Sequence, residues 1–275
     1  MYGAILGDII GSPYEFDQGG KTKVFPLFSP ESEYTDDTVL TLAVAQAFLE
    51  MDFAEDDDVT YDRLVYYLRD WTVRYPRRDY GSRYIQWIYS GGYKPYNSWG
   101  NGAAMRVAAV GWLFRDLKLT RAMARLSASV THNHPEGKKG AEATAAAIYL
   151  ARTGSTKAEI REFIEREIGY DLSRTCDEIR PGYHHVESCQ ETVPEAITAF
   201  LEGESFEDVI RTAVSLGGDC DTLTCIAGAI AEAFFGVPEE LKEKCRGYLD
   251  GTMLEVLDRF EARIRGGELI SYEEI

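Results

Sequence analysis

The stretch from Ser215 to Gly236 constrains this chain more than any other part of its sequence. It begins with the turn Gly217-Gly218, after which apolar residues recur at every third or fourth position. This spacing is typical of the buried face of a helix. The apolar positions are Leu223, Ile226, Ala227, Ile230 and Phe234. Gly236, followed by Pro238, predicts the end of the helix.

The start of this helix carries Asp219, Asp221 and Thr222. Residues two apart on an ideal helix point about 200° away from each other. We therefore expect both aspartates to reach one point only if they lie in the turn before the first helical turn. Two carboxylates and a hydroxyl are hard oxygen ligands, suited to Mg²⁺, Mn²⁺ or Ca²⁺. The alternative is an ordinary helix N-cap, where Asp and Thr are common.

A second polar cluster opens another apolar helix, expected from Asp36 to about Glu50. The cluster consists of Thr35, Asp36, Asp37 and Thr38. Adjacent acids repel each other, and a single cap needs only one of them. We therefore predict that both helices point at one cation site. Four Asp and two Thr residues fit a pair of divalent ions about 4 Å apart, and without metal their carboxylates would raise some of their own pKa values.

Charge and composition exclude several classes of partner. The chain has 275 residues and a formal net charge of −17, which argues against binding a nucleic-acid backbone and suits a protein that concentrates cations. No apolar run approaches the ~20 residues that span a membrane. The first residues lack a basic region and include Asp8, which argues against a signal peptide. The five cysteines lack paired spacing, so we expect reduced thiols and a cytoplasmic protein.

The remaining pattern is helical throughout. There is no long linker, no repeat of fixed period and no sustained strand alternation, so we predict one all-α domain over residues 1–275, built as a helical bundle. Pro13 should stop any N-terminal helix by Ser12. We expect a solvated acidic loop over 52–58. Further helices are expected at 61–74, from 103 to 110, and at 120–130, 140–152, 156–168, 192–201, 206–215 and 238–264.

Two glycine-containing loops are candidates for binding an anion. The turn 77–84 presents the backbone N–H groups of Gly81 and Ser82, or it is a plain surface turn. The loop 98–102 precedes a helix of small residues, whose start carries a partial positive charge. A plain helix start is the simpler interpretation of this loop. Trp99 within it could stack on a base or lie in the core.

Glu15 and His132 are further candidates. Glu15 lies between two aromatic residues, which would raise its pKa if it faced a site, although it could also be a solvated acid. His132 lies in a loop where we favour a hydrogen bond to phosphate or carboxylate over metal ligation. Zinc is not expected, because the spacing of Cys176, His184, His185 and Cys189 matches no zinc pattern.

Together these motifs resemble the ADP-ribosylglycohydrolase family over nearly the full length. The segments GAILGDIIGSPYEF, YTDDT, RDYGSRY, SWGNGAAMR, THNHPEG and SLGGDCDTLTCIAGAIAEAFFG occur in the family's order. The resemblance implies an orthogonal all-helical bundle with two Mg²⁺ or Mn²⁺ ions in a central cleft. It implies hydrolysis at the anomeric ribose carbon through an oxocarbenium-like transition state, with release of ADP-ribose.

The resemblance also assigns roles to residues. One ion would be held by Thr35, Asp36, Asp37 and Asp221, and the other by Asp219, Asp221 and Thr222 with Asp36 or Glu15. Catalysis would fall to Glu15, Asp36, Asp37 and Asp221. The pyrophosphate would be bound by Gly81, Ser82, Ser98, Gly100, Asn101 and Gly102. Trp99 would face adenine, and His132 would lie near the ribose and phosphates.

The acceptor is left open by the resemblance. Members that act on ADP-ribosyl-arginine often have an acid three positions before the asparagine of GNG, where this chain has Ser98. This favours O-linked substrates, on serine or as O-acetyl-ADP-ribose. The expected partner is an ADP-ribosylated substrate or ADP-ribose, bound by a monomer, with no nucleic acid or membrane partner. The alternatives are a hydrolase of another phosphoester and an inactive ADP-ribose-binding relative.

Overall fold

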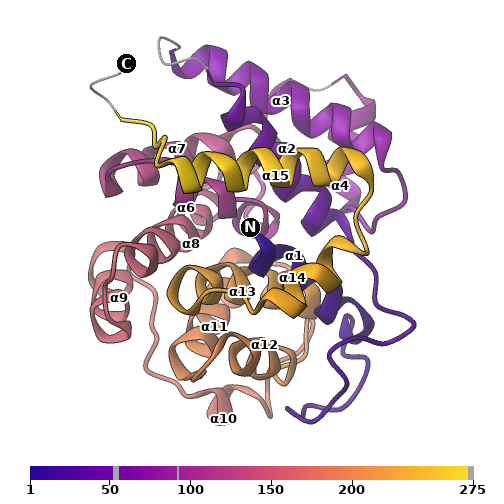
Figure 1. Ribbon diagram of the computed structural model, residues 1–275, viewed down its shortest axis with the longest axis vertical. Helices are drawn as coiled ribbons and strands as arrows, with labels where there is room; N and C mark the ends of the chain where they lie inside the picture. Colours follow the sequence, from indigo (N-terminus) through magenta and orange to yellow (C-terminus); the bar gives the residue numbers. More distant parts are fainter. Residues whose placement is uncertain (52–55, 92, 272–275) are drawn as a thin grey trace.

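The computed structural model describes residues 1–51, 56–91 and 93–271. These residues form helices joined by loops, and within them the only β-pairing is two isolated bridges, Gly100 with Ser188 and Phe114 with Ile270. The all-α prediction is therefore confirmed (Figure 1). None of the described helices is both long and apolar enough to cross a membrane. All five cysteines are buried and free.

The helices are joined by connections of different lengths, and residues 15–35 form a long one. They are α1 (Tyr2–Gly11), α2 (Asp36–Leu49), α3 (Asp57–Arg74), α4 (Ser82–Tyr89), α5 (Gly102–Met105), α6 (Ala108–Leu113), α7 (Leu117–Ser129), α8 (Pro135–Arg152), α9 (Lys157–Phe163), α10 (Cys176–Ile179), α11 (Cys189–Glu202), α12 (Phe206–Val214), α13 (Cys220–Phe235), α14 (Glu239–Arg246) and α15 (Gly251–Gly266). A 3-10 turn, η1 (Ser12–Tyr14), follows α1, and a π-helical turn, η2 (Ile164–Ile168), follows α9.

Helix α13 lies at the centre of the bundle. Every residue from Cys220 to Ala231 is buried, as is the whole of α1. Helices α1, α8, α11 and α12 pack around α13, and α1 lies directly beside it (Figure 1). Because both helices are apolar on nearly all sides, each is stable only inside the protein. This packing carries the start of α13, with its acids, to the inside of the molecule.

Glycines allow α1 and α13 to approach closely. A Cβ atom placed on Gly7 would lie 2.2 Å from the carbonyl oxygen of Thr224, and one on Gly11 would lie 2.6 Å from the Cα of Asp221. Both distances are shorter than any real contact, and the second atom in each pair is backbone. Only glycine therefore permits this separation of the two helices.

The Gly7→Ala variant tests this packing. We expect a loss of about 3 kcal/mol in the free energy of unfolding, at the upper end of the usual cost of overpacking, because the helices must move apart to accept the methyl group. Gly251→Ala is the matched control, since a Cβ there has no neighbour within 4 Å. Chemical denaturation of both variants measures the difference. Equal stabilities would contradict the close approach of α1 and α13.

Several predicted boundaries were wrong. The single helix expected over 238–264 is two helices, because Asp250 caps a new helix by accepting hydrogen bonds from the backbone of Thr252 (2.9 Å) and Met253 (3.0 Å).

In the expected acidic loop, residues 52–55 lie outside the described residues, and Asp56 instead caps α3. The 103–110 helix is divided between α5 and α6, and the 156–168 helix changes to a π-helical turn at Ile164. Ser82 begins a helix that was not predicted.

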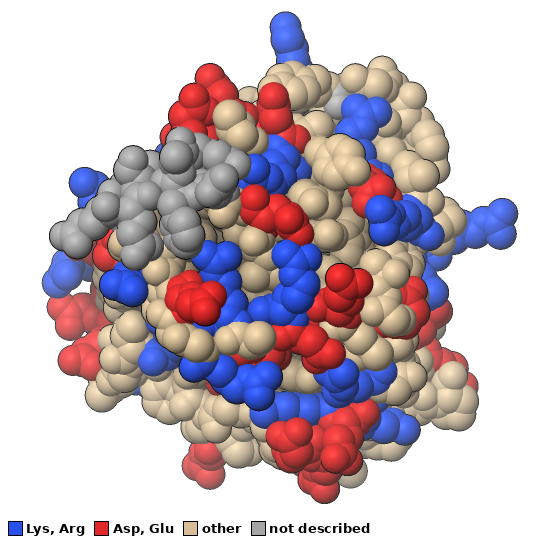
Figure 2. Space-filling model, turned by 45° about the horizontal axis from the view of Figure 1, so that its top comes forward, with Lys and Arg blue, Asp and Glu red and all other residues tan. Residues whose placement is uncertain are grey.

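The surface mixes charges of both signs. On the face shown in Figure 2, Lys and Arg side chains lie among Asp and Glu side chains rather than forming a separate field. Ion pairs such as Arg74–Asp70 (2.9 Å) and Arg259–Glu50 (2.7 Å) illustrate this pairing. Exposed pairs of this kind contribute little to stability.

Candidate active site

The starts of α2 and α13 meet inside the protein, although they lie far apart in the sequence. The Thr222 hydroxyl donates to Asp37 Oδ2 at 3.2 Å, and the Thr35 hydroxyl lies 3.3 Å from Asp221 Oδ2. Thr35 is the N-cap of α2, and Asp36 and Asp37 occupy its first turn. The structure thus brings together the two polar clusters that the sequence singled out.

One detail of the expected geometry was wrong. Asp221 lies in the first turn of α13 rather than in the preceding turn, and Asp219 is the N-cap residue. The N-cap backbone of Asp219 is non-helical, with φ −77° and ψ 76°, so the spacing of an ideal helix does not apply to this pair. Carboxylate oxygens of Glu15, Asp219 and Asp221 consequently lie within 4.8 Å of one another.

Asp8 was missed by the sequence analysis. It lies on the buried helix α1, and its carboxylate accepts hydrogen bonds from the backbone N–H groups of Thr35 (2.9 Å) and Thr38 (3.0 Å) and from both threonine hydroxyls. Asp8 therefore satisfies the free donors at the start of α2. The available signal was a lone acid in an otherwise apolar helix, which must find polar partners when it is buried.

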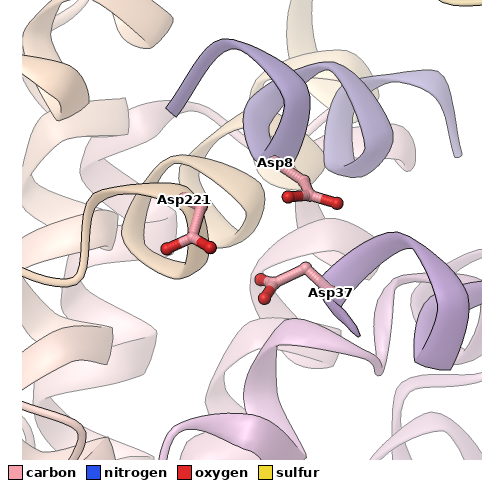
Figure 3. A group of neighbouring side chains, drawn as sticks. All are labelled: Asp8, Asp37 and Asp221. Atoms are coloured by element: carbon pink, nitrogen blue, oxygen red, sulfur yellow. The ribbon is translucent and has the colours of Figure 1, made fainter. Parts of the chain in front are cut away.

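Asp8, Asp37 and Asp221 form a second group of acids. Their oxygens also lie within 4.8 Å of one another, and the three side chains point at a common centre from α1, α2 and α13 (Figure 3). Asp221 belongs to both groups. Asp36 lines the cavity in front of them but belongs to neither group.

These acids have the properties of cation ligands. Burial, together with the charge of Asp221, raises the pKa values of Asp36 and Asp37 well above the usual range, and burial with the charge of Asp219 does so for Asp221. Burial raises the pKa of Asp8 to about 6 and that of Asp219 to about 7. Within the described residues, no Lys or Arg side chain forms an ion pair with any of these five aspartates, namely Asp8, Asp36, Asp37, Asp219 and Asp221.

One oxygen gives a direct test of the fit. Asp37 Oδ1 is buried and has no hydrogen-bond partner among the described residues. A buried acceptor without a partner is costly, and a bound cation would remove this cost. The donor set is entirely carboxylate and hydroxyl, as Mg²⁺ and Mn²⁺ prefer. The residues present therefore fit a hard divalent cation.

A cavity of about 230 Å³ opens above the acids. Most of the predicted site residues line it, namely Glu15, Asp36, Asp37, Gly81, Ser82, Ser98, Gly100, Asn101, Gly102, His132, Asp219, Asp221 and Thr222. Burial, followed by the charges of Asp221 and Asp79, raises the pKa of Glu15 to about 8. Lining residues that the sequence analysis did not select include Asp79, Arg83, Tyr96, Arg106, His185 and Glu187.

Two predicted residues lie outside the lining of this cavity. Thr35 is buried behind it, between Asp8 and Asp221. Trp99 is 46% exposed, and its ring makes an edge-type contact with the ring of His134, with centroids 5.6 Å apart. Asn101 lines the cavity but uses its side-chain amide to donate to Asp219 (2.6 Å) and Thr192 (3.1 Å). Asn101 thus holds Asp219 in place.

The fold and the site define a helical protein with groups of buried carboxylates, of a kind that could hold a divalent cation, beneath a cavity. Residues 1–268 match the family described as ADP-ribosylglycohydrolase, and the chain belongs to this family. The resemblance seen in the motifs is therefore confirmed.

Relatives extend over most of the chain. It is 28% identical to the human "ADP-ribosylhydrolase ARH3", covering 92% of this chain and 90% of the relative. It is 28% identical to the "ADP-ribosylarginine hydrolase Tri1" of Pseudomonas putida, covering 89% and 72%. An uncharacterised protein of Archaeoglobus fulgidus is 30% identical, and the match covers 94% of this chain and 92% of that protein. A solved structure titled "ADP-ribosylglycohydrolase-related protein complex" has a TM-score of 0.64 and 23% identity over 95% and 93%, and shows a similar fold.

Proposed function

We propose that this chain is a metal-dependent hydrolase that cleaves the bond at the anomeric ribose carbon of ADP-ribosylated substrates and releases ADP-ribose. The observation that carries the proposal is the pair of acid groups that share Asp221 beneath a cavity. Membership of the ADP-ribosylglycohydrolase family, and the names of the human and Pseudomonas relatives, support ADP-ribosyl linkages as the substrate class.

Two Mg²⁺ or Mn²⁺ ions are the proposed cofactors. Thr35, Asp36, Asp37 and Asp221 would hold one ion, and Glu15, Asp219, Asp221 and Thr222 the other. The role of Asp8 is to orient Thr35 and Thr38, because its oxygens already accept hydrogen bonds from both residues. Such ions, when bound, supply positive charge that holds ribose hydroxyls and lowers the pKa of a water molecule.

Glu15 is the proposed acid/base residue. With its pKa raised to about 8, it is largely protonated near neutral pH in the metal-free site, whereas its ordinary value would leave it ionised. It lies at the cavity within reach of Asp219 and Asp221. The carboxylates around it would favour the positive character that the ribose ring gains in the transition state.

The nucleotide would extend away from the acids along the glycine-containing loops. Backbone N–H groups at Gly81, Ser82 and Gly102 are the proposed pyrophosphate donors. Those of Gly100 and Asn101 already donate to Ser98 Oγ (3.1 Å) and to the Glu187 carbonyl (2.8 Å), so these two residues would shape the loop. Ser98, where an acid is common in members that act on ADP-ribosyl-arginine, favours an O-linked acceptor. Trp99 remains the proposed adenine contact, although its ring would have to turn from His134 to reach the cavity.

A product assay on three substrates tests the proposal. We expect Mg²⁺-dependent release of free ADP-ribose from serine-linked or O-acetyl ADP-ribose, with a slower rate on arginine-linked ADP-ribose. A chelator should remove the activity, and added Mg²⁺ should restore it. Release of AMP or inorganic phosphate would instead identify a phosphoester hydrolase. Binding of ADP-ribose without turnover on any substrate would identify an inactive relative.

A further inference from the structure

Arg106 is a buried arginine at the cavity for which the proposed mechanism gives no role. It follows α5, is 0% exposed and lines the cavity. Its Nη2 donates to the Ser127 carbonyl (3.2 Å) and to the Thr131 hydroxyl (2.8 Å). Nε and Nη1 have no hydrogen-bond partner among the described residues. Because a guanidinium does not lose its proton in proteins, a fixed positive charge lies beside the cavity.

Thr131 connects this charge to His132. The Thr131 hydroxyl oxygen lies 2.7 Å from His132 Nδ1. Arginine can only donate, so one lone pair of the Thr131 oxygen is used by Arg106. The hydroxyl hydrogen is then available to His132. Among the hydrogen bonds of the described residues, His132 Nδ1 is the acceptor within reach of this hydrogen.

This arrangement favours one tautomer of His132, because in the other the Thr131 hydroxyl hydrogen would have no hydrogen-bond acceptor among the described residues. If Nδ1 accepts from Thr131, the proton of a neutral imidazole must be on Nε2. Burial, followed by the charges of Arg106 and Arg83, lowers the pKa of His132 well below its usual value, so the ring is neutral. The Tyr96 ring also faces it, with centroids 5.8 Å apart.

Nε2 faces the Gly100–Gly102 turn of the cavity. A Cβ atom on Gly100 would lie 3.4 Å from Nε2, and one on Gly102 would lie 3.3 Å from it. Because these positions have no side chain, that edge of the ring is left uncovered. Within the described residues, Nε2 has no hydrogen-bond partner, so its N–H is available to an acceptor in the cavity.

We propose that Arg106 and Thr131 are positioning residues that fix His132 in the Nε2–H tautomer, so that it donates a hydrogen bond to an oxygen of the bound ligand. The identity of the ligand oxygen, which belongs to a phosphate or the ribose of ADP-ribose, depends on the proposed function. The tautomer does not, because it is a property of the free protein. In the opposite arrangement, Nδ1–H donates to Thr131 and Nε2 is an acceptor.

The test measures the tautomer directly, by ¹⁵N NMR of protein labelled on histidine and without ligand. Comparison with His132→Gln assigns the His132 signals among the four histidines. We expect the Nε2–H pattern in the wild type and in Thr131→Ser, which keeps the hydroxyl. Thr131→Val removes only the hydroxyl, and we expect signals of the Nδ1–H tautomer to appear. Thermal unfolding of both variants checks that they are folded.

Titration with ADP-ribose then tests the consequence. We expect Thr131→Val to weaken binding by roughly fivefold to tenfold, as for the loss of one hydrogen bond, and Thr131→Ser to bind like the wild type. An Nδ1–H pattern in the wild type, or an unchanged pattern in Thr131→Val, would overturn the positioning role. If the NMR patterns are as expected but none of the proteins binds ADP-ribose, the positioning role stands and the proposed function fails.

Discussion

Asp221→Asn is expected to lower the rate of ADP-ribose release by at least about 10³-fold. Several kcal/mol of transition-state stabilisation depend on the cation site, and each 1.4 kcal/mol corresponds to about a tenfold change in rate. Asp221 is the one residue common to both acid groups, so its replacement weakens both proposed ion positions. The measurement is the initial rate with saturating Mg²⁺ on the best substrate of the product assay.

The control for this variant is Glu162→Gln, which makes the same change from carboxylate to amide on an exposed side chain paired with Arg166. Its rate should match that of the wild type. Without metal, Asp221→Asn should be at least as stable as the wild type, because it removes one of several buried like charges. A variant that is folded and retains more than a tenth of the activity would refute the central role of Asp221.

The second large effect concerns stability in the absence of metal. We expect the free energy of unfolding to fall as the pH rises from about 4 to about 8. The pKa values of Asp8, Asp219 and Glu15 are raised to about 6, about 7 and about 8, chiefly by burial. The folded protein therefore binds more protons than the unfolded chain in this window, and its stability declines as these protons are lost.

The expected size of this decline is a few kcal/mol, or about 5–10 °C in Tm. Mg²⁺ should oppose it, because a cation binds the deprotonated folded site and hardly binds the unfolded chain. Thermal unfolding with a chelator, and then with excess Mg²⁺, measures both effects across the pH range. The stabilisation by Mg²⁺ should grow with pH. A Tm that rises with pH in the chelator, or an effect of Mg²⁺ that does not depend on pH, would count against the account.

The polar starts of α2 and α13 could be recognised from the sequence because each contains more acidic residues than helix capping requires. One acid is sufficient to cap a helix, whereas both α2 and α13 begin with more acids than capping needs. Apolar spacing predicted that each helix is buried, and two buried polar starts have to find common partners. The meeting of the two polar clusters could therefore be predicted from residue types and their positions alone.

Asp8 and Arg106 could not be assigned in this way. Each is a single charged residue within an apolar or small-residue segment, and its partners come from other parts of the chain. Gly7 and Gly11 let α1 lie against α13, and this packing places Asp8 near Asp221. The helix over 238–264 was overextended because apolar spacing continues across Gly247 and Asp250, where the cap on Asp250 starts a new helix.

The most direct test of the proposed metal site is a crystal structure of the protein grown with Mn²⁺, with anomalous diffraction used to locate the ions. We expect two peaks about 4 Å apart at the bottom of the cavity, both in contact with Asp221. A well-ordered cavity without any anomalous peak would contradict this expectation. So would a lysine or arginine side chain that neutralises Asp37 and Asp221 in place of an ion.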